Sequence, residues 1–127
     1  MHRVDIGNSA GYIFSVKSGE CEFSVDMKGE QGVTPPDAFL ASLGTCIGVY
    51  IRKYVEGAKL DIPEFNIRVE ADYDVAKPVC FRKIQVSIDL KGAGLDERRL
   101  RAMLEFIKNC SVHNTLKNNP DVEIRIN

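Results

Sequence analysis

Hydrophobic residues alternate with polar ones in the first third of the chain, which predicts strands with one buried face. They occupy every second position in two runs, with Tyr12, Phe14 and Val16 in residues 10–16 and Cys21, Phe23, Val25 and Met27 in residues 21–27. Residues 17–20 between them contain Ser-Gly, a pair typical of hairpin turns. A shorter strand is expected at residues 3–6. The first third therefore predicts strands joined by hairpins.

The hydrophobic period then lengthens to three or four residues, which predicts a helix. Its hydrophobic stripe consists of Phe39, Leu43, Cys46, Ile47, Tyr50 and Tyr54. Thr34 is the expected N-cap, with Pro35 at the first helical position, Asp37 completing a capping box and Gly57 at the end. Several small residues in this segment would let another backbone approach closely: Ala41, Ser42, Gly44, Thr45 and Gly48. We therefore expect the helix to be covered on more than one side.

The second half predicts two long strands, a second helix and a final strand. Hydrophobic and polar residues alternate in residues 65–73 and 84–90, and a three-to-four-residue period follows in residues 96–109. A short turn is expected at residues 112–116, and a last strand at residues 122–126. This order favours a single α+β domain spanning residues 1–127, with antiparallel sheets and helices on one side, over a doubly wound parallel sheet.

The composition of the chain argues against nucleic-acid binding and membrane binding. Hydrophobic residues make up 44% and charged residues 28% of the chain, and the net charge is −1. Such a balance is ordinary for a globular protein and offers no electrostatic footprint for nucleic acid or for an anionic membrane. No hydrophobic run approaches a bilayer span, and the first residues lack the pattern of a signal peptide. The expected location is the cytoplasm, where cysteines are usually reduced.

The chain has four cysteines, and no two of them form a CxxC motif. Their spacing, and that of the two histidines, gives no support for a zinc site. Cys21 and Cys80 are in phase with the hydrophobic residues of predicted strands, and are expected to be packed as small hydrophobic side chains.

Cys46 and Cys110 leave two interpretations open. Cys46 lies on the hydrophobic stripe of the long helix, so packing in the core competes with reactivity. Cys110 precedes Ser111 at a junction between two helical segments. If Ser111 caps the second segment, free amide groups lie close to the sulfur, which favours a thiolate. His113, three residues further on, either approaches the same sulfur or acts as a surface or capping residue.

Two motifs read together are more specific than either cysteine. The segment GVTPPDAFLASLGTCI contains Cys46, and CSVHNTL begins with Cys110. With the predicted order of elements, they resemble the OsmC/Ohr family (osmotically inducible protein C and organic hydroperoxide resistance proteins), and in particular its shorter, less characterised members. The resemblance covers essentially the whole chain.

The resemblance implies an OsmC-like fold in an intertwined homodimer, with long central helices packed between sheets. It implies a thiol-dependent peroxidase that uses no metal, flavin or haem. Cys46 would attack an organic hydroperoxide and become a sulfenic acid, Cys110 would resolve it as a disulfide, and a cellular dithiol would reduce that disulfide.

Supporting residues are also expected from the resemblance. Family peroxidases carry a glutamate ten residues before the first cysteine. Pro36 occupies that position here, and Asp37 is the neighbouring acidic residue. Arg3 is the candidate for the activating arginine of an N-terminal strand. Apart from the resemblance, His113 is a third candidate because it follows Cys110 by three residues. The alternative function is a non-enzymatic dimer that binds a small ligand or senses redox state.

Overall fold

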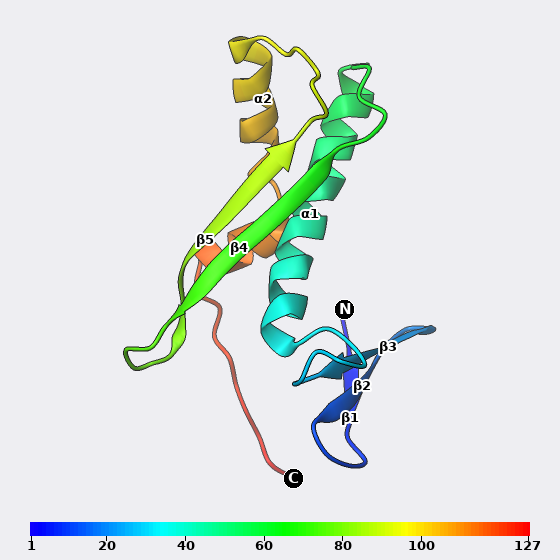
Figure 1. The fold of residues 1–127 in the computed structure, drawn as a ribbon, viewed down its shortest axis with the longest axis vertical. Helices are drawn as coiled ribbons and strands as arrows, with labels where there is room; N and C mark the ends of the chain where they lie inside the picture. Colours follow the sequence, from blue (N-terminus) through cyan, green and yellow to red (C-terminus); the bar gives the residue numbers. More distant parts are fainter. The chain divides into compact units, whose positions relative to one another are not determined.

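The computed structural model describes residues 1–127, which form two compact units, Met1–Ala41 and Ser42–Asn127. The elements follow the order β1–β2–β3–α1–β4–β5–α2–α3 (Figure 1). Both sheets are antiparallel, so the predicted α+β class is confirmed. None of the helices combines the length and hydrophobicity needed to cross a bilayer.

The first unit is a three-stranded sheet in the order β1–β2–β3. Its strands are β1 (Asp5–Gly7), β2 (Ile13–Ser18) and β3 (Cys21–Asp26). Gly19 turns the chain between β2 and β3 with a φ of 59°, a conformation that glycine adopts without steric cost. The buried Asp26 carboxylate accepts hydrogen bonds from the amides of Gln31 and Lys28, which hold its pKa below the usual value. These bonds order the loop that leads into the long helix.

Helix α1 spans Pro35–Gly57, as the capping residues predict. The Thr34 hydroxyl accepts a hydrogen bond from the amide of Asp37 at 3.3 Å, which confirms Thr34 as the N-cap. Leu43, Ile47, Ile51 and Val55 lie at four-residue intervals and form the buried side of the helix.

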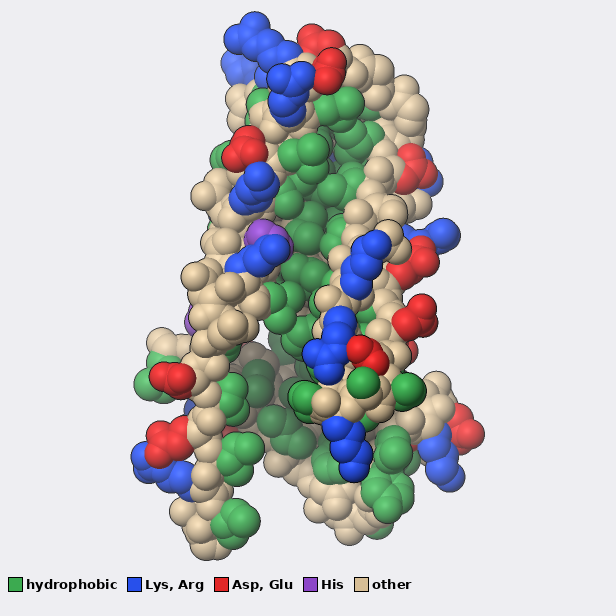
Figure 2. Space-filling model, turned by 90° about the vertical axis from the view of Figure 1, so that its left-hand side faces the viewer, with side chains coloured by type: hydrophobic (Ala, Val, Ile, Leu, Met, Phe, Trp, Pro, Cys, Tyr) green, Lys and Arg blue, Asp and Glu red, His purple; other side chains and the backbone are tan.

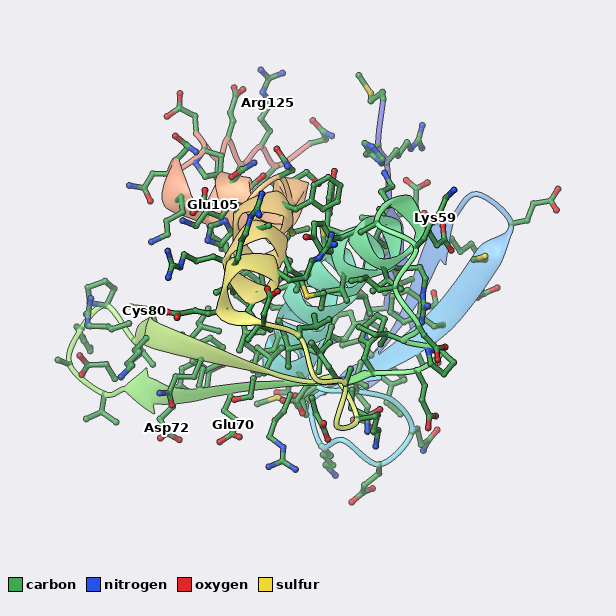
Figure 3. The ribbon with its side chains drawn as sticks, turned by 90° about the horizontal axis from the view of Figure 1, so that it is seen from above. Lys59, Glu70, Asp72, Cys80, Glu105 and Arg125 are labelled. Carbon is green, nitrogen blue, oxygen red and sulfur yellow. The ribbon has the colours of Figure 1, made fainter.

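The second unit places α1 and α2 on the same side of a two-stranded sheet, as the view from above shows (Figure 3). Strands β4 (Asn66–Asp74) and β5 (Cys80–Asp89) pair antiparallel, and Glu70 and Asp72 point away from the helices. A Cβ added at Gly44 would lie 2.9 Å from Cγ2 of Val69. The glycine therefore allows the close approach of α1 to β4.

The core of this unit lies between α1 and α2 (Glu97–Ile107). Asp96 is the N-cap of α2, and its carboxylate accepts a hydrogen bond from the Arg99 amide. Its buried residues are Leu43, Ile47, Ile51, Val55, Ile62, Met103, Ile107 and Cys110. Phe106 of α2 also packs against two tyrosines of α1, with ring centroids 5.9 Å from Tyr50 and 5.7 Å from Tyr54. The short helix α3 (Ser111–Lys117) follows α2 and begins directly after the buried cysteine.

The structure contradicts the expected strand at residues 122–126 and the expected packing of Cys21. Residues 122–126 form no strand, and the side chains of Val122, Ile124 and Ile126 are 79%, 85% and 97% exposed. A strand requires a hydrogen-bonded neighbour, and no strand of this chain pairs with the segment. Cys21 is exposed, since it begins β3 beside the hairpin turn. Cys80 is half-buried at the hairpin end of β5.

Candidate functional site

The fold brings together two cysteines from elements far apart in the sequence. Cys46 lies in the middle of α1 and is half-buried, whereas Cys110, just before α3, is fully buried. Both are free thiols, and they lie close enough for each to shift the pKa of the other. Contact between two thiols is the arrangement required for a reversible disulfide.

Cys110 is itself the N-cap of α3. Its sulfur accepts a hydrogen bond from the backbone amide of His113 at 3.4 Å, because α3 begins at Ser111 and the N-cap is the residue before it. The condition considered above, in which Ser111 caps this helix, is therefore not met. The Ser111 hydroxyl instead faces the other thiol, with 3.9 Å between Ser111 Oγ and Cys46 Sγ.

The Cys46 thiol is more acidic than an ordinary cysteine. Burial raises its pKa, but hydrogen bonds lower the pKa by more, and the balance falls below the usual value. The groups that lower the pKa are, in order of effect, the Cys110 thiol, the Val112 amide, and the hydroxyl and amide of Ser111. Because a thiolate accepts these bonds better than a thiol does, the contacts favour the nucleophilic form.

The Cys110 thiol is shifted in the opposite direction. Burial raises its pKa, the hydrogen bond and negative charge of Cys46 raise it further, and the His113 amide opposes them only in part. The two thiols therefore titrate as a coupled pair, in which Cys46 loses its proton first and Cys110 stays protonated as a donor. The two thiols therefore differ in acidity, with the pKa of Cys46 lowered and that of Cys110 raised.

The three predicted supporting residues occupy different places. Arg3 lies before β1 and pairs with Asp5, with 3.0 Å between Arg3 Nη2 and Asp5 Oδ1. Asp37 lies in the first turn of α1, about 13 Å along the helix axis from Cys46 by helical rise. His113 contributes its backbone amide to Cys110, and the Nδ1 atom of its ring is buried without a partner. A role of these three side chains towards Cys46 stays a prediction.

Ser111 and the Val112 amide are the site groups that sequence reasoning missed. The only signal was a hydroxyl residue directly after the second cysteine, and it was assigned to a helix cap. The structure shows no group of three or more His, Cys, Asp or Glu side chains that could hold a metal ion.

The fold and the site define a small α+β protein with two neighbouring free cysteines whose pKa values are shifted in opposite directions. The family model described as OsmC-like protein matches residues 28–125. The chain therefore belongs to the OsmC-like family, and the predicted resemblance is confirmed.

Solved structures share the fold at low sequence identity. An OsmC-like protein from Mycoplasma pneumoniae superposes with a TM-score of 0.80 at 16% identity, covering 94% of this chain and 89% of the other. A hypothetical protein from Aquifex aeolicus gives 0.77 at 18%, with 95% and 90% covered. The organic hydroperoxide resistance protein OhrB of Bacillus subtilis gives 0.62 at 19%, with 97% and 95% covered. A search of curated proteins found no significant match.

Proposed function

We propose that the protein is a thiol peroxidase of the cytoplasm that reduces organic hydroperoxides through Cys46 and Cys110. The observation that carries the proposal is the pair of neighbouring free thiols, Cys46 and Cys110, whose pKa values are shifted in opposite directions. An acidic thiol supplies a nucleophile near neutral pH, and a protonated neighbour supplies a second thiol within reach.

In the first half of the cycle, the Cys46 thiolate attacks the terminal oxygen of the hydroperoxide, which carries the hydrogen. The S–O bond forms as the O–O bond breaks, and the alkoxide leaves as an alcohol after taking up one proton. Cys46 is thereby oxidised by two electrons to a sulfenic acid. The Cys110 thiol, which lowers the pKa of Cys46, favours the thiolate that this step requires.

In the second half, the Cys110 sulfur attacks the Cys46 sulfenic acid. Cys110 loses its proton, the S–O bond breaks, and the hydroxyl leaves as water while the disulfide forms. An external dithiol then returns both cysteines to thiols and is itself oxidised to a disulfide. The cycle therefore uses only the two sulfurs, a hydroperoxide and a dithiol.

The side chains around the thiols support an organic rather than a small polar hydroperoxide. Cys46, Tyr50, Val112 and Leu116 pack against the hydrophobic core of the second unit. An alkyl or aryl group is compatible with such surroundings. The Bacillus subtilis protein OhrB, which shares this fold, is named for resistance to organic hydroperoxides.

Replacing Cys110 by serine tests the second half of the cycle. With a dithiol present, we expect the Cys110→Ser variant to turn over cumene hydroperoxide about tenfold or more slower than the parent, because its sulfenic acid is reduced only by direct attack of the external dithiol. Dimedone should trap the sulfenic acid at Cys46, as peptide mass spectrometry would show. The matched control is Cys80→Ser, which removes a half-buried cysteine of β5. Multiple turnover with dithiothreitol at the parent rate in Cys110→Ser would contradict the proposed cycle.

We also propose that the chain works as a homodimer. Large hydrophobic side chains are exposed in both units, among them Tyr12, Phe23 and Met27 in the first and Val122, Ile124 and Ile126 in the second. Figure 2 shows hydrophobic side chains gathered in a strip through the upper half of the view, with charged side chains at its borders. Exposed hydrophobic surface of this kind is typical of an interface. The alternating residues 121–127 suit addition to a sheet edge of a second copy.

A single charge in the last segment tests the dimer. We expect Ile124→Glu to weaken self-association about tenfold or more, because burying an unpaired carboxylate is unfavourable. Light scattering after gel filtration over a dilution series measures the change. The control is Arg125→Gln, which alters the neighbouring side chain that pairs with Glu123. A parent protein that is monomeric at all concentrations, or an Ile124→Glu variant that dimerises like the parent, would refute the interface.

A further inference from the structure

The pKa of the Cys46 thiol is lowered, and the positively charged side chains of the chain do not explain this shift. Reactive cysteines commonly have a lysine, arginine or protonated histidine beside the sulfur. Arg3 instead pairs with Asp5, and its side chain is 76% exposed. Arg52, one and a half turns after Cys46 on α1, donates to the carbonyls of Ile62 and Pro63 at 3.1 Å each. The contacts that favour the Cys46 thiolate are all hydrogen bonds.

We propose that the Ser111 hydroxyl is a catalytic group, which stabilises the Cys46 thiolate in place of a cation. The proposal rests on the 3.9 Å contact between Ser111 Oγ and Cys46 Sγ. It rests on the proposed function only in taking Cys46 as the nucleophile. The assignment concerns the side chain of Ser111 and not the dipole of α3, which is only seven residues long.

The physical reason is the difference between the two protonation states of sulfur. When Cys46 is a thiol, either atom can be the donor of this hydrogen bond. When Cys46 is a thiolate, the sulfur can only accept, so the Ser111 hydroxyl donates to it. A hydrogen bond to a charged acceptor is shorter and about twice as strong as one between neutral groups. The serine therefore stabilises the thiolate more than the thiol.

The hydroxyl of Ser111 lies at the start of α3, where the neighbouring backbone groups already have other partners. The amide of His113 is bound to Cys110, and the Ser111 carbonyl accepts from Thr115 Oγ1 at 2.7 Å. Thr115 thus provides a matched comparison, because its hydroxyl belongs to the same short helix and bonds to the backbone of that helix. Removing it affects the helix without removing a donor to Cys46.

The test is the pH dependence of Cys46 alkylation by iodoacetamide in the full-length protein, followed by peptide mass spectrometry. We expect Ser111→Ala to move the midpoint upward by about one pH unit, since a hydrogen bond to a charged group has about that effect. Below the midpoint, alkylation should slow about tenfold. Ser111→Thr should restore the parent midpoint, and Thr115→Ala should leave it unchanged. Cys21, which is exposed, provides an internal reference in every sample.

An unchanged midpoint in Ser111→Ala would overturn the inference. So would an equal shift in Thr115→Ala, because the effect would then come from the stability of α3. The experiment contains no hydroperoxide, so its outcome is independent of the proposed peroxidase activity. If the midpoint moves as expected and the parent protein consumes no hydroperoxide, the role of Ser111 stands and the proposed function fails.

Discussion

The Cys46→Ser variant is expected to lose dithiol-dependent consumption of cumene hydroperoxide by about a thousandfold or more, because the nucleophile of the first step is gone. A serine hydroxyl is not ionised near neutral pH, and the hydrogen bonds that favour a thiolate do not supply a comparable alkoxide. Residual consumption should match that of the dithiol alone. The loss of hydroperoxide absorbance or of the reductant measures the rate.

The substitution is small enough to separate chemistry from folding. Oxygen for sulfur is nearly isosteric, and Cys46 is half-buried rather than enclosed. We therefore expect a melting temperature within a few degrees of the parent value. The matched control is Cys21→Ser, which removes an exposed cysteine of β3 and should keep full activity.

A Cys46→Ser variant as active as the parent would refute the peroxidase mechanism. If the parent itself is inactive, and neither Cys46 nor Cys110 reacts faster than a free thiol, the alternative of a non-enzymatic ligand-binding or redox-sensing protein is favoured. The rate of sulfenic acid formation, measured with dimedone, distinguishes these two functions because it requires no reductant.

Much of the fold follows from local sequence signals. The alternation of hydrophobic and polar residues places β4 and β5, and Thr34, Pro35 and Gly57 mark the ends of α1. Such signals are short-range, since the side-chain period and the caps depend on residues within one or two turns. The helices and strands that these signals mark can therefore be predicted without knowing what each element packs against.

The features that the sequence did not reveal depend on long-range contacts. Residues 121–127 have the alternation of a strand, yet pairing needs an edge that no local pattern supplies. The contact between Cys46 and Cys110 depends on how α3 lies against α1, and was expected only from the family resemblance. The structure makes Cys110, and not Ser111, the N-cap of α3, because a one-residue shift of a helix start changes which side chain caps it.

Truncating Ile51 is expected to produce the largest loss of stability among single core substitutions. The side chain is fully buried in the middle of α1, within the cluster that includes Val55 and Ile107. Ile51→Ala should lower the free energy of unfolding by about 3–4 kcal/mol, because it removes buried methyl groups and leaves a cavity. At that cost a marginally stable domain loses a large fraction of its stability, which urea titration at one fixed protein concentration would measure.

The matched variant Leu104→Ala, which deletes as many carbons from a side chain that is 55% exposed, should cost about 1 kcal/mol or less. Equal losses in the two variants would show that Ile51 is not the centre of the core, because burial is the property that distinguishes them.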